Sequence, residues 1–208
     1  MQNKFWKKKR VLITGANGFI GSNLMFELLQ KQAEVFVLVN SLKNENPIFS
    51  SVKDKITKIT IGNVVDFDLV KNIFLKNKIE ICFHLAAQAI VKNAFDSPRE
   101  TLLTNIVGTI NALEAARCST HLKSFVVAST THVYGDNKEL PYLESFYPRP
   151  TRPYETSKIC ADILAQTYFH TYNLPVAIAR FTNAYGPGDF NFSRVVPKAM
   201  LSVIKKRN

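Results

Sequence analysis

The stretch Val11–Gly21 reads VLITGANGFIG: a short apolar strand runs into three glycines spaced by three residues and then opens a helix. Gly15 can take the positive φ of a tight turn, Gly18 lets the backbone approach a diphosphate, and Gly21 lets the new helix pack closely on the strand. Unpaired N–H groups and the positive end of the helix dipole then face the anion. The stretch therefore predicts a dinucleotide-binding turn with the diphosphate at residues 19–21.

Strand-like and helix-like segments alternate along the rest of the chain. Runs rich in Val, Ile and Phe predict strands, and the patterns between them predict helices. The predicted strands are residues 10–14, 34–39, 58–61, 79–85, 124–128 and 176–180, and the predicted helices are residues 18–32, 66–77, 99–117 and 154–173. This alternation predicts an α/β fold: a Rossmann-like, doubly wound parallel sheet in the order 3-2-1-4-5-6, with helices on both faces.

Length, charge and cysteines limit the function classes. The 208 residues suffice for one substantial core. The net charge of +11 suits polyanionic small molecules, and no nucleic-acid motif accompanies it, so we expect no nucleic-acid partner. Three scattered cysteines, Cys82, Cys118 and Cys160, favour a reducing compartment and argue against a metal site. Because neither a membrane-span pattern nor a secretory leader pattern is found, we expect a cytoplasmic protein without membrane contact.

The segment Tyr154-Glu155-Thr156-Ser157-Lys158 carries a second signal. On a helix, residues i and i+4 share a face, so the phenol and the ammonium can address one ligand. A free tyrosine, with a pKa near ~10, is a poor base at neutral pH, but a nearby lysine cation and an oxidised nicotinamide favour its phenolate. Tyr154 and Lys158 are therefore candidate catalytic groups.

These features together resemble the short-chain dehydrogenase/reductase superfamily, and Gly18-Phe19-Ile20-Gly21 resembles its extended branch, the NAD-dependent nucleotide-sugar epimerases and dehydratases. Residues 128–135, ASTTHVYG, are similar to that branch's Ser-Ser/Thr-x-x-Val-Tyr-Gly segment. The resemblance makes Thr130 the hydroxyl that bonds the sugar oxygen being oxidised. It implies Thr130, Tyr154 and Lys158 as the catalytic set, NAD as the cofactor, and a nucleotide-diphosphate sugar as the substrate that is transiently oxidised at C4.

Further stretches extend the resemblance over essentially the whole chain. Residues 84–88, HLAAQ, resemble the segment lining the cofactor's ribose and diphosphate; residues 62–64, GNV, stand at the adenine position; and residues 180–188, RFTNAYGPG, match Arg-x-x-Asn-x-Tyr-Gly-Pro-Gly. The implied cofactor-binding residues are Gly15, Asn17, Gly18, Phe19, Ile20, Gly21, Asn40, Asn63, Val64, Leu85, Ala86, Ala87, Asn105, Tyr154 and Lys158. The implied substrate-binding residues are Gln88, Thr131, His132, Asn183 and Arg194.

The chain departs from its relatives at two places. The 4,6-dehydratases carry Asp-Glu or Asp-Lys after the catalytic hydroxyl, where this chain has Thr131 and His132. Histidine moves protons near neutral pH, and loss of the acid favours epimerisation, whereas residues 188–197 are similar to the CDP-glucose 4,6-dehydratase-like group. His132 as an ordinary loop imidazole is equally open. After the second strand, Asn40 is neither an acid for the ribose nor an arginine for a 2′-phosphate; we expect NAD, with Lys43 leaving NADP open.

The resemblance also bears on completeness and assembly. The relatives carry a further C-terminal region that completes the sugar pocket, so we expect one Rossmann-like domain over 1–208 that includes the start of an incomplete substrate-binding region from about 186. The alternative function is therefore a nucleotide-binding module with little or no turnover. Relatives pair two helices into a dimer interface, and apolar residues in excess on 99–117 and 154–173 predict a homodimer.

Overall fold

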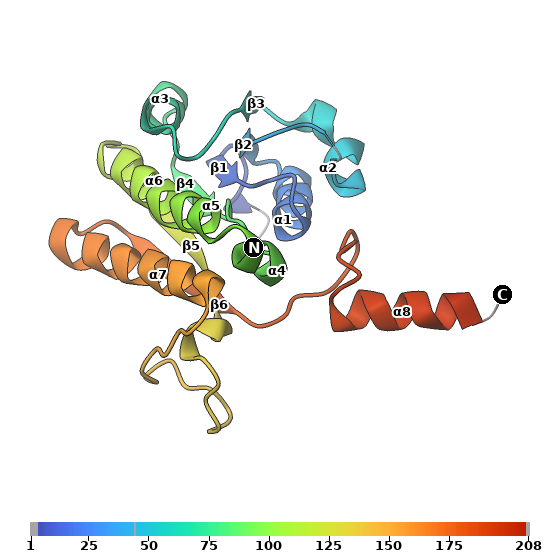
Figure 1. Ribbon diagram of the computed structural model, residues 1–208. Helices are drawn as coiled ribbons and strands as arrows, with labels where there is room; N and C mark the ends of the chain where they lie inside the picture. Colours follow the sequence, from blue (N-terminus) through green and yellow to red (C-terminus); the bar gives the residue numbers. More distant parts are fainter. Residues whose placement is uncertain (1–3, 44, 207–208) are drawn as a thin grey trace.

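A six-stranded parallel sheet in the order β3-β2-β1-β4-β5-β6 forms the centre of the computed structural model, which describes residues 4–43 and 45–206 (Figure 1). The strands are β1 (Arg10–Thr14), β2 (Glu34–Val39), β3 (Lys58–Ile61), β4 (Ile81–His84), β5 (Ser124–Thr130) and β6 (Val176–Phe181). Each neighbouring pair is parallel. The predicted fold class and strand order are confirmed.

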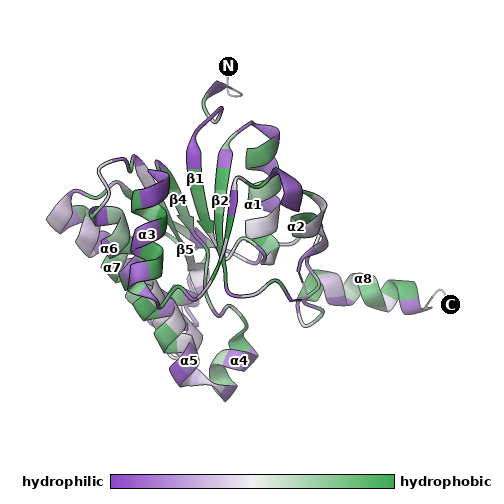
Figure 2. Ribbon diagram, turned by 90° about the horizontal axis from the view of Figure 1, so that it is seen from above, coloured by the Kyte–Doolittle hydropathy of each residue, from purple (hydrophilic) through white to green (hydrophobic). Residues whose placement is uncertain are grey.

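Helices cover both faces of the sheet. On one face lie α1 (Phe19–Gln30) and α2 (Pro47–Ser51), and on the other lie α3 (Phe67–Asn77), α6 (Gly108–Arg117) and α7 (Pro153–Tyr172) (Figure 2). Successive side chains of a strand point to opposite faces. Val11 and Ile13 therefore pack with Met25 of α1, whereas Leu12 packs with Phe74 of α3. Two apolar cores result, one on each face of the sheet.

Several local elements differ from the predicted ones. The helix expected at 99–117 consists of α5 (Pro98–Leu102), a π-helical turn (Leu103–Val107) and α6. Five further elements were not predicted: the helices α2 (Pro47–Ser51), α4 (Val91–Asp96) and α8 (Val195–Lys206), and the 3-10 turns Lys53–Lys55 and Thr131–Tyr134. Short helices such as α4 carry too little periodicity to be distinguished from loops, because one or two turns do not repeat an apolar face.

Two segments extend from the body around the sheet: the Pro-rich loop before α7, and α8 at the end of the chain (Figure 1). Within the described ranges no helix combines the length and the apolar character that crossing a bilayer demands. Residues 1–3, 44, 207 and 208 of the predicted domain lie outside the described residues. Only some of the apolar residues of α6 and α7 are buried. Leu113 and Ile159 lie in the core, whereas Ile110 and Ile163 are exposed to solvent.

Candidate functional site

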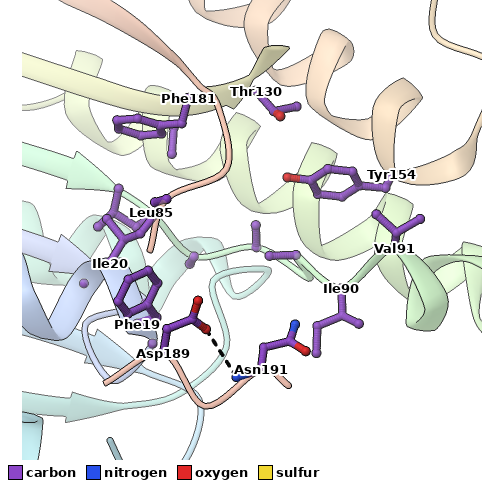
Figure 3. Close-up of a pocket in the computed structure, with 18 of the residues that line it drawn as sticks. Phe19, Ile20, Leu85, Ile90, Val91, Thr130, Tyr154, Phe181, Asp189 and Asn191 are labelled. Carbon is purple, nitrogen blue, oxygen red and sulfur yellow. Dashed lines mark hydrogen bonds between the residues drawn. The ribbon is translucent and has the colours of Figure 1, made fainter. Parts of the chain in front are cut away.

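A cavity of about 660 Å³ lies at the carboxyl edge of the sheet. It is lined by the glycine turn after β1 and by residues at or following the ends of β2, β4, β5 and β6 (Figure 3). Ligands of doubly wound sheets bind at this edge, and the volume falls within the range of small-molecule sites. The site therefore lies where the sequence places it.

The glycine turn forms one wall of the cavity. Gly15 has φ +71°, and a Cβ there would lie 2.9 Å from the Ala86 Cα, while a Cβ at Gly21 would overlap the Gly15 carbonyl oxygen and lie 2.8 Å from the Ala16 Cα. The predicted turn role of Gly15 and packing role of Gly21 are thus confirmed. At Gly18, φ is −78° and a Cβ would meet only the Gly15 oxygen, at 3.3 Å. Its contact with a diphosphate stays a prediction.

Polar residues brace this wall. Asn17 Nδ2 donates to the Ser41 carbonyl at 2.8 Å, which ties the glycine turn to the segment after β2. Asn63 lines the cavity, and its Oδ1 accepts the Val65 N–H at 3.1 Å, so one lone pair of that oxygen is committed locally. Asn40 also lines the cavity, whereas Lys43 does not. Among the described residues that line the cavity, β2 and the segment after it therefore supply no cation for a 2′-phosphate.

The three predicted catalytic residues face the same cavity. Thr130 ends β5, and Tyr154 and Lys158 lie one turn apart on α7. Figure 3 shows the phenol oxygen of Tyr154 directed toward Thr130. Burial raises the pKa of Tyr154, and a hydrogen bond with Thr130 and the charge of Arg194 act in the opposite direction.

Lys158 lines the cavity one helical turn from Tyr154, and the effect of its charge on the Tyr154 phenolate stays a prediction. Its ammonium is buried and donates to the Ala128 carbonyl at 2.8 Å. Burial lowers the pKa of Lys158 to about 8. The charge of Arg194 lowers the pKa of Tyr154, and the hydrogen bond of Lys158 to Ala128 holds α7 against β5.

A buried ion pair fixes the same helix. Asp162 of α7 is fully buried and receives Arg180 of β6 through both of its oxygens, at 2.8 and 3.2 Å. Ser129 of β5 donates to the same carboxylate at 3.0 Å, and Arg180 donates to the Tyr134 hydroxyl at 2.7 Å. Because the pair is bidentate and its lone pairs are satisfied, it locks α7, β5 and β6 together beside Thr130.

Three predicted site residues do not line the cavity: Gln88, Asn105 and Thr131. Gln88 turns its side chain to the backbone of Ile90, at 2.6 and 3.2 Å. Asn105 is buried, and its amide bonds the backbone of Gln88 and the Ser157 hydroxyl. Asn105 therefore braces the wall from behind, a role that requires knowing which segments meet in three dimensions.

The segment after β6 supplies wall residues that the sequence did not indicate. It crosses back to α1, where Asn23 donates to the Pro187 carbonyl at 3.0 Å, and it brings Asp189 and Asn191 to the cavity (Figure 3). Arg194 lies 5.8 Å over the Phe19 ring and 3.4 Å from Asp189. The resemblance indicated Asn183 and Arg194 of this segment, and both line the cavity, but it did not indicate Asp189 or Asn191.

His132 lines the cavity, with its ring 6.4 Å from that of Tyr154. Among the described lining residues, Asp189 supplies the only carboxylate, and it is paired with Arg194. No cluster of three or more His, Cys, Asp or Glu that could hold a metal occurs in 4–43 or 45–206. The groups that can move protons on the part of the cavity around Thr130 are therefore the Tyr154 phenol, the His132 imidazole and the Lys158 ammonium.

The chain matches the family model described as GDP-mannose 4,6 dehydratase over residues 12–208. It is 36% identical over 205 residues to a dTDP-D-glucose 4,6-dehydratase of Dictyostelium discoideum, covering 91% of this chain and 47% of that protein. A trifunctional UDP-glucose 4,6-dehydratase, epimerase and reductase of Arabidopsis thaliana is 34% identical over 211 residues, covering 97% of this chain and 31% of that one. The chain thus spans less than half of either relative.

Solved structures resemble the model closely. A dTDP-glucose 4,6-dehydratase of Streptomyces venezuelae with NAD bound gives a TM-score of 0.85 at 28% identity, covering 95% of this chain and 62% of that one. A UDP-glucose 4-epimerase of Thermotoga maritima with UDP-glucose gives 0.83 at 28% identity, covering 93% and 62%. In both comparisons the likeness therefore extends over more than nine-tenths of this chain.

Proposed function

The chain belongs to the GDP-mannose 4,6 dehydratase family, and from this premise we propose that it is an NAD-dependent nucleotide-sugar epimerase or dehydratase that works through transient oxidation at sugar C4. One observation carries the proposal: a single cavity joins the glycine turn to Thr130, Tyr154 and Lys158. The glycine turn would hold the dinucleotide, and Thr130 and Tyr154 would hold the sugar in the same cavity. The substrate is a nucleotide-diphosphate sugar, held by groups that include Asn183 and Arg194.

The residues around the glycine turn and the end of β2 suit NAD. The backbone at Gly18 is open to the cavity, and the helix N-terminus behind it offers N–H groups to a diphosphate. Leu38 and Asn40 line the β2 end, while the lining cations among the described residues are Lys92, Lys158 and Arg194, none of them near β2. This distribution favours NAD over NADP. When bound, NAD supplies the hydride acceptor for C4.

Tyr154 is the base in the proposed reaction. It takes the proton of the 4-hydroxyl while Thr130 holds that oxygen, because proton removal must be aligned with bond breaking at one carbon. Arg194 eases the ionisation of the phenol, whose pKa burial otherwise raises. Lys158 keeps α7, and with it the phenol, in place through the Ala128 carbonyl.

The groups around Tyr154 favour epimerisation over loss of water. Elimination needs a proton for the departing 6-hydroxyl as well as a base for the neighbouring C–H. His132 is the imidazole nearest to the phenol, and the carboxylate of Asp189 is engaged by Arg194. A 4-keto sugar that simply rotates and is reduced on its other face makes no demand on a second acid.

The setting we propose is a cytoplasmic homodimer. Cys82, Cys118 and Cys160 are all free thiols, which suits a reducing compartment. The exposed side chains of Leu103, Ile110 and Ile163 on the helices facing away from the sheet supply apolar area for a partner. The substrate region of the proposed domain begins near residue 186, in the segment that follows β6 (Val176–Phe181).

The test incubates the protein with NAD and several nucleotide-diphosphate hexoses and detects 4-keto products and 4-epimers by mass spectrometry and NMR. Tyr154→Phe should remove turnover and leave NAD affinity within about twofold, since only the proton-accepting oxygen is lost. Tyr185→Phe, a phenol on the same cavity, is the matched control. Turnover that survives Tyr154→Phe would overturn the mechanism.

A nucleotide-binding module with little turnover is the second candidate. The chain covers 62% of the Streptomyces structure and 47% of the Dictyostelium enzyme, and both candidates agree with that extent of match. Retained NAD binding with no product from any sugar would support the module and reject the enzyme.

A further inference from the structure

A buried histidine joins the cofactor wall to the catalytic helix. His84 ends β4, is 3% exposed, and lies opposite Thr14 in the β1–β4 register. Its Nδ1 is 2.9 Å from the Thr14 hydroxyl oxygen, and its Nε2 is 3.2 Å from the Thr109 hydroxyl oxygen of α6. Both threonines are themselves buried. The imidazole therefore exchanges hydrogen bonds only with protein groups on either side.

The direction of these bonds follows from the outer partners. Thr109 donates its one hydroxyl proton to the Asn105 carbonyl at 2.6 Å, so it can only accept from His84. Nε2 must then carry the proton, and Nδ1 of a neutral ring must accept from the Thr14 hydroxyl. Thr14 Oγ1 in turn accepts the Ala86 N–H at 3.1 Å. The alternative tautomer leaves the Thr14 proton without an acceptor.

The ring is also held neutral. Burial first, and the charge of Lys158 second, lower the pKa of His84 to about 3. A protonated ring would present two donors, and Thr14 would have to turn its proton away from Nδ1. The four bonds from the Ala86 amide to the Asn105 carbonyl thus run in one direction.

Both ends of this chain of bonds reach the site. Ala86 lines the cavity, and a Cβ added at Gly15 would lie 2.9 Å from the Ala86 nitrogen and Cα. The Ala86 backbone therefore packs directly against the glycine turn. Asn105 bonds the Ser157 hydroxyl at 2.8 Å, and Ser157 precedes Lys158 on α7. We therefore expect that a substitution at His84 or Thr109, in the middle of this series of hydrogen bonds, moves the glycine turn relative to α7.

We propose that His84 is a positioning residue, present as the neutral Nε2–H tautomer, that aligns the dinucleotide wall at Ala86 with the helix carrying Tyr154 and Lys158. Its effect on NAD affinity rests on the proposed function, whereas its tautomer does not. Such support is worth about tenfold in ligand affinity, the usual cost of leaving one buried polar group without its partner.

The first measurement is the ¹⁵N spectrum of the histidine-labelled, ligand-free protein, with the His84 signals identified among the four histidines by their absence in His84→Gln. We expect one protonated Nε2 and one unprotonated Nδ1, constant from about pH 5 to about pH 8, where a free imidazole changes its charge. A protonated Nδ1, or an averaged pair of signals, would overturn the inference whether or not the protein binds NAD.

The second measurement compares Thr109→Val with Thr109→Ser by the same spectrum and by NAD calorimetry, at a temperature where both remain folded. Valine removes the acceptor for Nε2–H and should disturb the tautomer and weaken NAD binding by about tenfold, while serine keeps both. A folded valine variant that matches the serine variant in tautomer and affinity rejects the positioning role. A wild-type chain that fails to bind NAD rejects the proposed function, and the tautomer result still decides the inference.

Discussion

Substituting Gly18 and Gly21 separately should divide ligand binding from folding. A Cβ at Gly18 meets only the Gly15 oxygen, at 3.3 Å, and φ of −78° suits any residue. A Cβ at Gly21 overlaps the Gly15 oxygen and approaches the Ala16 Cα to 2.8 Å, both backbone atoms that cannot move without shifting α1 from β1. Gly18→Ala should therefore affect binding, and Gly21→Ala should affect stability.

The magnitudes follow from these contacts. At the N-cap of α1, alanine stabilises the helix less than glycine does. Alanine also lowers the conformational entropy of the unfolded chain, which stabilises the folded protein. The two effects on the free energy of unfolding cancel to within about 1 kcal/mol. The methyl group does, however, stand between a diphosphate and the backbone, and one lost charge-assisted hydrogen bond costs about 1.5–3 kcal/mol, or about 10- to 150-fold in affinity. For Gly21→Ala, overpacking costs about 1–3 kcal/mol, or about 2–12 °C in Tm for a chain of this length.

Thermal unfolding followed by fluorescence gives Tm for both variants, and titration calorimetry gives their NAD affinities. The expected pattern is a Tm for Gly18→Ala within about 4 °C of the wild type together with weakened NAD binding. Unchanged NAD affinity in Gly18→Ala would refute the placement of the diphosphate. Equal loss of Tm in both variants would refute the separation of roles.

Three other outcomes test the scaffold. Asp162→Asn should cost about 3–5 kcal/mol in urea unfolding because it leaves the charge of Arg180 without its buried partner, whereas Asp96→Asn in an exposed pair should leave the midpoint unchanged. Hydrogen bonds from Lys123 and Lys9 and from the Arg10 amide lower the pKa of Glu80 from 4.5 to about 2. The stability that the Glu80 carboxylate contributes is therefore present above about pH 4.5 and is lost as the pH falls toward 2. In Glu80→Gln, the free energy of unfolding should depend less on pH in that window. Ile163→Glu, on the exposed face of α7, should convert a dimer into a monomer in sedimentation, and a monomeric wild type at micromolar concentration would contradict the dimer.

The strands and the glycine turn were predictable because they depend on short-range chemistry. Apolar β-branched runs marked each strand of the sheet to within two residues at either end, and the glycines matched positions where a Cβ meets backbone. Tyr154 and Lys158 were indicated by their spacing of four residues on one predicted helix, and Thr130 by the family resemblance. All three line the same cavity.

The rest depended on contacts between distant segments. Gln88 and Asn105 bond to each other, which removes both from the cavity, and neither residue type reveals such a pairing in sequence. Asp189 reaches the cavity only because the segment after β6 folds back onto α1. The direction of the hydrogen bonds at His84 depends on five residues, which come from β1, β4, the segment after β4, the π-helical turn and α6.

The π-helical turn Leu103–Val107 between α5 and α6 has a consequence for tracing how such chains diverge. A π turn accommodates one residue more than an α-helical path through the same space. Deleting a single residue there would let α5 and α6 merge into one regular helix, but it would rotate the preceding residues by about 100° about the axis. A homologous chain with a continuous helix here would align with this one only if a one-residue gap were opened within Leu103–Val107. Asn105, which bonds to Ser157, would mark the position of that gap.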